Sequence, residues 1–307
     1  MADTPIFDRI TIVGAGLIGS SVARAIRRGK LAGHLCMVDA SKEVLSEAAA
    51  LGLADSYSLN AAEGVVGAGL VMLAVPVGAM ASVGATMAPS LMDGAIVSDV
   101  GSVKESVFKA LSPLLPDHVH LIPGHPVAGT EQSGPGAGFA SLFDGRWCIL
   151  TPSEGADQGA LDKLTAFWQG LGSTVEIMDA KHHDLVLAIT SHVPHLIAYN
   201  IVGTASDLEE VTRSEVIKYS AGGFRDFTRI AASDPTMWRD VFLNNKDAVL
   251  EMLGRFSEDL TALQRAIRWG DGDALFDLFS RTRDIRRRII DAGQDDAKAD
   301  FGRPHED

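Results

Sequence analysis

Short apolar runs alternate with longer stretches of helical spacing through the first half of the chain. The runs have the length of buried strands, and apolar side chains recur every three or four residues between them. This alternation predicts an α/β domain built on a doubly wound, largely parallel sheet. Strands are expected at residues 10–13, 35–38, 70–75, 95–99, 120–123, 147–150 and 174–177, and helices at 41–51, 104–114 and 158–171.

After about Asp179 the strand pattern ends, and the rest of the chain is typical of helices. Residues 185–202 are apolar on nearly every face, so we expect them to be buried on all sides. Further on, apolar residues at alternating spacings of four and three form a seam suited to helix–helix packing. The seam fits an intrachain core or a dimer interface, and we favour a dimer because this apolar surface exceeds what a domain of about 120 residues covers alone. Its residues are Val249, Leu253, Phe256, Leu260, Leu263 and Ile267.

A glycine-spaced turn, Gly14-Ala15-Gly16-Leu17-Ile18-Gly19, directly follows the first expected strand. Gly14 permits a tight turn, Gly16 lets the backbone approach a pyrophosphate, and Gly19 allows close contact between helix and strand. A structural strand–helix turn is the alternative. The coincidence with the flanking elements favours a Rossmann-type dinucleotide site.

A helix is expected over residues 17–28, and its first residues, Leu17 and Ile18, would aim its positive end at the phosphates. Asp39 lies 20 residues beyond Gly19, at the end of the second expected strand, where it can accept hydrogen bonds from an adenosine ribose. An acid there would repel a 2′-phosphate. The pattern therefore predicts NAD as the cofactor rather than NADP.

Composition and charge limit the cellular compartment and the kinds of partner that we expect for this chain. The 307-residue chain carries a formal net charge of −13, so we expect neither nucleic acid nor membrane as a partner. The uncharged stretch 64–92 contains Pro76 and Pro89, which argues against a membrane span. Cys36 and Cys148, without metal-type spacing, indicate a reducing compartment. With no signal peptide in the first nine residues, we expect a cytoplasmic protein without a metal site.

His125 is the first candidate for chemistry, because it follows an expected strand on the sheet edge where ligands bind. The loops 74–78, 99–104 and 124–134 are expected to meet there. Imidazole suits a dehydrogenase that needs a base to take a hydroxyl proton near neutral pH. A histidine that merely caps the strand end is the alternative.

Arginines and histidines in the second half form further candidates. Arg225 and Arg229 lie among glycines and aromatics, as in a clamp for a carboxylate. A salt-bridged helix start is the alternative, which we favour for Arg225 and leave open for Arg229. His192 and His195 share a helix face, and hydrogen bonding in a substrate pocket is favoured over zinc. His182 and His183 face different ways and are expected at the surface.

Four separated segments resemble motifs of the prephenate/arogenate dehydrogenases of tyrosine biosynthesis. They are residues 124–134, 99–104, 191–195 and 222–238, and the likeness keeps its order over roughly residues 8–270. The chain most resembles bacterial cyclohexadienyl enzymes without a fused mutase or amino-acid-sensing domain. The expected domains are 1–180 for dinucleotide binding and 181–294, helical, for substrate and dimerisation, with a disordered tail at 295–307.

The resemblance implies NAD-dependent oxidative decarboxylation of prephenate and/or arogenate to 4-hydroxyphenylpyruvate or tyrosine, by a homodimer. It implies that His125 bonds the C4 hydroxyl and takes its proton, and that Arg229 holds the ring carboxylate. Ser102, His195 and Glu131 match residues lining the substrate pocket, and Trp238 matches a residue that reaches across the dimer interface.

Two other functions remain open on the residues alone. A β-hydroxyacid-type dehydrogenase would use a catalytic lysine, for which the helical half offers Lys218 and Lys246 without matching surroundings. A non-catalytic NAD-binding regulatory protein could keep the fold. Such a protein would have no need for His125 and Arg229 together.

Overall fold

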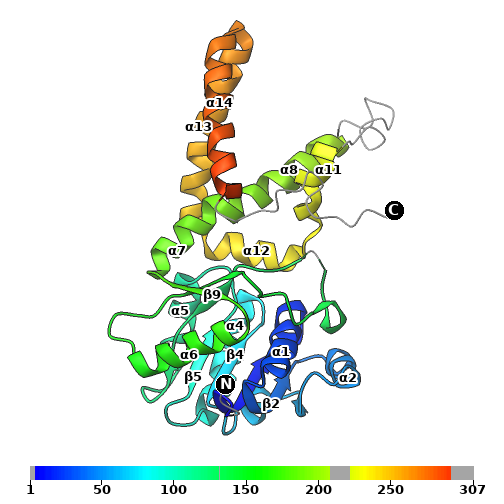
Figure 1. Ribbon diagram of the computed structural model, residues 1–307, viewed down its shortest axis with the longest axis vertical. Helices are drawn as coiled ribbons and strands as arrows, with labels where there is room; N and C mark the ends of the chain where they lie inside the picture. The colour runs from blue at the N-terminus through cyan, green and yellow to red at the C-terminus, as the bar shows by residue number, and fades with distance from the viewer. Residues whose placement is uncertain (1–3, 131, 208–221, 292–307) are drawn as a thin grey trace. The chain divides into compact units, whose positions relative to one another are not determined.

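The computed structural model describes residues 4–130, 132–207 and 222–291, and the chain divides into two compact units, residues 1–250 and 251–307. The first unit contains a six-stranded parallel sheet in the order β3-β2-β1-β4-β5-β6 (Figure 1). This confirms the predicted α/β doubly wound class. The strands are β1 Phe7–Val13, β2 Ala32–Val38, β3 Ser56–Ser58, β4 Leu70–Leu73, β5 Ile96–Asp99 and β6 His120–Leu121.

Two helical layers cover the sheet, because successive side chains of each strand point to opposite faces. One face packs against α1 (Leu17–Gly29) and α6 (Gln158–Gly170), with Ile12 and Trp168 in its core. The other packs against α4 (Met80–Met87) and α5 (Glu105–Leu111), with Leu73 in its core. Two shorter helices, α2 (Lys42–Ala50) and α3 (Ala61–Gly64), also lie beside the sheet.

A second, three-stranded sheet was not foreseen. It consists of β7 (Gly124–Pro126), β8 (Trp147–Leu150) and β9 (Thr174–Ile177), with β7 antiparallel to β8. The single sheet expected to hold residues 120–123, 147–150 and 174–177 is therefore wrong in this detail. Pro123 has no backbone N–H to continue a ladder, so the first sheet ends at Leu121 and the chain enters the second sheet at Gly124.

Four further α-helices lie wholly within the described part of the first unit: α7 Ala180–Leu187, α8 Val193–Asp207, α11 Gly222–Thr228 and α12 Pro235–Asn244. A π-helical turn, Ala188–His192, joins α7 to α8. Pro194 lacks the N–H that a regular helix needs at this point, which accounts for the irregular turn. By length and composition the whole stretch Ala180–Asp207 would also pass as a membrane span, a test that core helices of soluble proteins pass too.

The expectation that residues 185–202 are buried on all sides is wrong for the chain as described. Leu185, Ile189 and Ile201 are 37%, 46% and 39% exposed. An apolar composition requires that these side chains be buried, but it does not specify whether the burying surface belongs to the same chain. These side chains mark a face that the described residues leave open.

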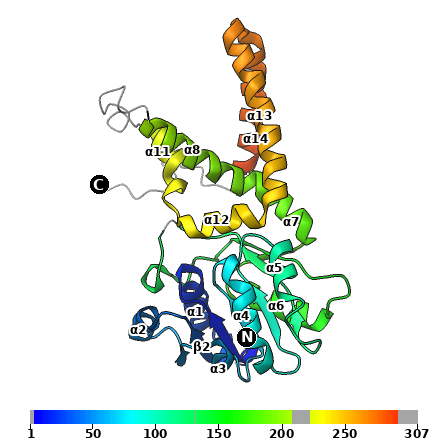
Figure 2. The same ribbon diagram turned by 180° about the vertical axis from the view of Figure 1, so that it is seen from behind.

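The second unit contains most of α13 (Lys246–Trp269) and all of α14 (Gly272–Asp291), which run side by side in Figures 1 and 2. The predicted seam lies along α13, and two of its later members are exposed: Leu260 is 43% and Ile267 67% exposed. An intrachain core does not cover them in the described part of the chain. The tail predicted to be disordered, 295–307, lies outside the described residues.

A buried ion pair fastens the start of α5 to the strand ends beside it. The Lys104 ammonium, fully buried, donates to the Asp99 carboxylate at the end of β5 and to the Gly124 carbonyl, 2.6 Å away, at the start of β7. Asp99 also accepts the backbone N–H groups of Gly101 and Gly124. Burial raises the pKa of Asp99 and lowers the pKa of Lys104, so these hydrogen bonds are what offset the cost of keeping both charges inside.

We expect Lys104→Met to lower the free energy of unfolding by about 3–5 kcal/mol, because it leaves the Asp99 carboxylate buried without its partner. Urea denaturation measures this difference. Lys109→Met is the matched control: its ammonium is 74% exposed and pairs loosely with Glu105, so the loss should stay within about 0.5 kcal/mol. Equal losses in the two variants would contradict the structural importance of the buried pair.

Candidate active site

The glycine turn after β1 has the geometry that its sequence predicted. A Cβ on Gly14, where φ is +105°, would lie 2.3 Å from the Ala74 carbonyl oxygen, and one on Gly19 would lie 1.9 Å from that of Gly14. A Cβ on Gly16 would meet nothing within 4 Å, so its outer side is open to a ligand. Gly16 begins α1 without a side-chain cap, which leaves the first N–H groups of the helix, near Leu17 and Ile18, available to phosphates.

Asp39 lies beside this turn, at the end of β2. Its carboxylate accepts the Ala15 N–H at 2.9 Å and the Ser41 N–H at 2.9 Å, which fixes its orientation. Gly14, Gly16 and Asp39 line one cavity of about 800 Å³. Most of its lining is apolar, and the described residues that line it include no lysine or arginine to meet a 2′-phosphate, so the residues present fit NAD.

A second cavity, of about 540 Å³, collects the residues expected to meet a substrate. His125 is 7% exposed at the middle of β7, where it pairs with Ile149 of β8, and its side chain lines this cavity. Elements far apart in the sequence supply the rest of the lining. The structure thus brings together five predicted residues, Ser102, His125, His195, Arg229 and Trp238.

His195 and Trp238 form one wall of the cavity. Their rings stack with centroids 3.7 Å apart, and His195 Nδ1 donates to the Ser191 carbonyl at 2.8 Å. Trp238 is 6% exposed, and its Nε1 has no hydrogen-bond partner among the described residues. His192 turns away to Asn245, at 3.1 Å. No group of three metal-ligating side chains occurs in the parts of the chain that the structure describes.

His183 contradicts the expectation that it lies at the surface. It is fully buried, and its Nε2 is 2.8 Å from Nδ1 of His125. Its Nδ1 is 2.8 Å from a carboxylate oxygen of Asp184. His182 is exposed as expected. Adjacent helical residues do face different ways, but α7 lies against the start of α5, so one of the two faces is interior.

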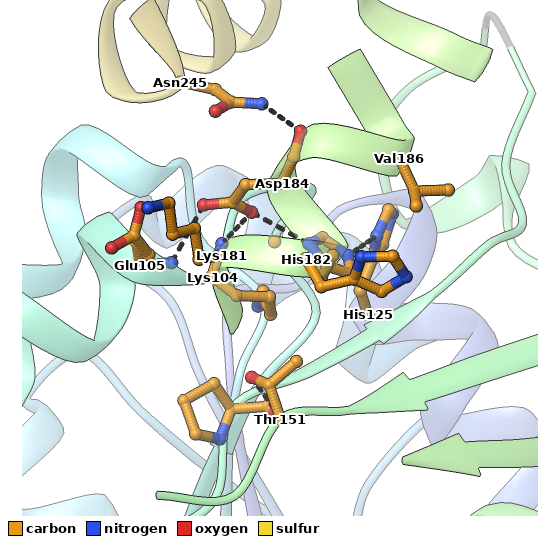
Figure 3. A network of polar contacts seen from close by, with 12 residues as sticks. Lys104, Glu105, His125, Thr151, Lys181, His182, Asp184, Val186 and Asn245 are labelled. Atoms are coloured by element: carbon orange, nitrogen blue, oxygen red, sulfur yellow. Dashed lines mark hydrogen bonds and ion pairs between the residues drawn. The ribbon is translucent and has the colours of Figure 1, made fainter. Parts of the chain in front are cut away.

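Asp184 connects the pair His183 and His125 to the sheet domain (Figure 3). Its carboxylate accepts the backbone N–H groups of Lys104, at 2.7 Å, and Glu105, at 3.0 Å, at the beginning of α5. Its carbonyl accepts the Asn245 side-chain amide at 2.8 Å. A hydrogen-bonded chain therefore runs from the start of α5 through Asp184 and His183 to His125.

The histidines of the site are held neutral near pH 7. Burial lowers the pKa of His125 well below its ordinary value, and the neighbouring His183 and Lys104 act in the same direction when charged. Burial lowers the pKa of His183 and, to about 4, that of His192. A neutral imidazole can accept a proton, so the site can act as a base.

Several sequence-predicted residues fall elsewhere. Arg225 is exposed, with its guanidinium 3.7 Å from Asp226, in keeping with the structural role favoured for it. Lys246 is exposed at the start of α13 and does not line the cavity. Glu131 and Lys218 lie outside the described residues.

Sequence reasoning missed three residues that support the site: Lys104, His183 and Asp184. Each carried a signal. His183 and Asp184 are adjacent polar residues at the start of an otherwise apolar stretch, where burial requires partners. Lys104 is the only charge between Gly101 and Glu105, directly after an acid-ended strand.

Comparison with known proteins gives a consistent result. The family model described as prephenate dehydrogenase, nucleotide-binding domain, matches residues 22–177, and that described as prephenate dehydrogenase, dimerization domain, matches residues 179–281. A cyclohexadienyl dehydrogenase from Zymomonas mobilis is 44% identical over 281 residues, covering 92% of this chain and 96% of the relative.

Solved structures agree. The crystal structure of prephenate dehydrogenase from A. aeolicus, in complex with hydroxyphenyl propionate and NAD+, has a TM-score of 0.86 and 33% identity, covering 92% of this chain and 98% of that one. Synechocystis arogenate dehydrogenase has a TM-score of 0.77 and 26% identity, covering 92% and 99%. With both domain models matched in order along most of its length, this chain belongs to the prephenate dehydrogenase family.

Proposed function

We propose that this protein catalyses the NAD-dependent oxidative decarboxylation of prephenate and/or arogenate, giving 4-hydroxyphenylpyruvate or tyrosine. The observation that carries the proposal is a single cavity that holds a buried neutral imidazole, His125, and a guanidinium, Arg229. The reaction needs both groups, because one end of the substrate ring bears a hydroxyl and the other a carboxylate. Family membership supports the same reaction.

His125 acts as the general base. Its Nδ1 is engaged with His183, so Nε2 is the nitrogen left to accept the proton of the substrate hydroxyl. Burial keeps the imidazole neutral, and therefore competent as a base, below the pH at which an exposed histidine would be protonated. His125 returns the proton to the oxygen of the phenol as the ring becomes aromatic.

Arg229 holds the ring carboxylate through charge-assisted hydrogen bonds until that group leaves as CO2. Ser102 and His195 line the same cavity and orient the substrate by hydrogen bonds, and the stacked Trp238 forms an apolar wall that excludes water. Glu131 belongs to the same group of substrate residues by resemblance alone. Together these side chains select a ring that carries both a hydroxyl and a carboxylate.

NAD would be held by Gly14, Gly16, Leu17, Ile18 and Gly19 at its pyrophosphate and by Asp39 at the adenosine ribose. When bound, it supplies the acceptor for the hydride from the hydroxyl-bearing carbon, while the electrons of the broken bond to CO2 stay in the ring. The close backbone approach at Gly16 and the fixed carboxylate of Asp39 support this assignment.

We further infer that the protein is a cytoplasmic homodimer. The family model over residues 179–281 describes a dimerization domain, and this region exposes large apolar side chains that a second copy could cover. Such side chains are Ile189, Ile201, Leu260, Ile267, Trp269 and Phe276. An acidic chain with two buried free cysteines suits a reducing interior.

The proposed reaction predicts that the purified protein reduces NAD when given prephenate or arogenate, and releases one CO2 for each NADH formed. Absorbance of the reduced cofactor and trapping of the released gas measure the two products. NADH formation without CO2 would indicate a simple alcohol dehydrogenase instead. No NADH with either substrate would refute the proposed function.

His125→Asn should lower kcat by roughly 10²–10⁴-fold and leave the KM values nearly unchanged, because the amide cannot accept the hydroxyl proton. Steady-state kinetics with both substrates measure this. His118→Asn, at an exposed histidine outside the cavity, is the control and should be unaffected. Near-normal turnover in His125→Asn would remove His125 from the mechanism.

Arg229→Ala should weaken substrate binding by roughly 1.5–3 kcal/mol, the value of a lost charged hydrogen bond. The dissociation constant of the product analogue hydroxyphenyl propionate would not report this loss, since it lacks the ring carboxylate, so the KM for prephenate is the measurement. Arg225→Ala removes a guanidinium that is 68% exposed and should change KM little. An unchanged KM in Arg229→Ala would rule out the clamp.

A further inference from the structure

The direction of each hydrogen bond between the start of α5 and His125 follows from one carboxylate, Asp184, together with the neutral state of His183, whose pKa is lowered by burial. Asp184 accepts two backbone N–H groups, those of Lys104 and Glu105, and these groups can only donate. Hydrogen bonds of this kind stabilise the ionised carboxylate. Asp184 is therefore an acceptor toward His183 as well, and the proton in their 2.8 Å contact lies on Nδ1 of His183.

The next contact follows from the first. A neutral imidazole carries one N–H, so Nε2 of His183 is left as an acceptor. His125 approaches that nitrogen with Nδ1, at 2.8 Å, and must donate to it. The neutral His125 then carries its proton on Nδ1 and a lone pair on Nε2.

We propose that His183 is a positioning residue, which holds His125 in the tautomer whose Nε2 is unprotonated and can take the substrate proton. This inference rests on the proposed function for its catalytic meaning, although the tautomer itself is a property of the protein alone. His183 does not line the cavity and acts only through His125. Without an acceptor at Nδ1, the His125 proton could move to Nε2, where it would block the base.

The same chain stabilises the charge that forms during the reaction. When Nε2 of His125 takes the hydroxyl proton, Nδ1 keeps its own, and the imidazolium donates to His183, which is backed by the Asp184 carboxylate. That support is needed because the site is buried and the Lys104 ammonium lies close by. The ionisable groups that influence His125 are Lys104, which directly precedes α5, His183 of α7 and His192 of the π-helical turn.

A purely structural role makes a different prediction. The His125 and His183 rings also meet edge to face, with centroids 5.1 Å apart and an angle of 70° between their planes. If this packing were the whole role of His183, an apolar side chain of similar size would preserve it. Packing alone would leave the tautomer and kcat of such a variant as in the wild type.

The test is ¹⁵N NMR of the full-length, ligand-free enzyme labelled at histidine, with the His125 signals identified by their loss in His125→Asn. The wild-type spectrum should show a protonated Nδ1 and an unprotonated Nε2 for His125. In His183→Leu the Nε2-protonated tautomer should become the major form. In the same variant kcat should fall by about 10²–10⁴-fold with little change in KM, the pattern of a base left in the wrong tautomer.

His183→Gln separates the tautomer from the packing. Its side-chain carbonyl can accept the Nδ1–H of His125 but cannot titrate, so the wild-type tautomer and a kcat within about tenfold of wild type should return. His182→Gln, at the exposed neighbour, should match the wild type in both measurements.

Two results would overturn the proposal: a wild-type His125 protonated on Nε2, or a His183→Leu variant that keeps Nε2 unprotonated. The wild-type spectrum decides the first even if His183→Leu does not fold. Failure of the proposed function would appear separately, as a wild-type enzyme that reduces no NAD with either substrate while its His125 tautomer is as expected.

Discussion

A single buried carboxylate, Asp184, sets the geometry on which the site depends. Its oxygens must be satisfied because an unpaired buried charge is costly, and the start of α5 and His183 satisfy them. Helix α7 is thereby fixed against the sheet domain, and His183 orients the imidazole of His125 through its contact with Nδ1. The local fold and the chemistry thus share one set of hydrogen bonds.

Lys104 links Asp184 to the end of strand β5 and the start of strand β7. Its backbone N–H binds Asp184, and its side chain binds Asp99 and the carbonyl of Gly124, the residue before His125. His125 is therefore supported at its backbone by the hydrogen bond of the Lys104 side chain to Gly124 and at its ring by His183. A nearby buried ammonium also opposes protonation of His125, in keeping with the neutral base that we propose.

Features that arise from local sequence were predicted well. The glycine turn and Asp39 at the end of β2 both follow from short-range rules of backbone geometry and of ligand position on parallel sheets. His125 was expected directly after a strand of that sheet, but it lies inside β7 of the second sheet. The same rule placed the loop that carries Ser102 beside the loop that carries His125. The grouping of His195, Arg229 and Trp238 with His125 required the family resemblance, because spacing alone left those three residues without a common location.

Features that depend on which elements meet were not predictable. Helical periodicity places His182 and His183 on different faces, but only the packing of α7 against α5 decides which face is buried. The separate sheet of β7, β8 and β9 was missed because short apolar runs do not reveal which sheet they join. The exposed apolar face of α7 and α8 shows the same limit. Its composition indicates that the face is buried by something, but not which part of which chain buries it.

The most direct measurement of the central claim is a crystal structure of the enzyme with NAD and 4-hydroxyphenylpyruvate. We expect Nε2 of His125 to lie within hydrogen-bond distance of the product hydroxyl while Nδ1 stays bonded to His183. A structure in which the His125 ring presents Nδ1 to the hydroxyl, or points away from it, would contradict a base that acts through Nε2.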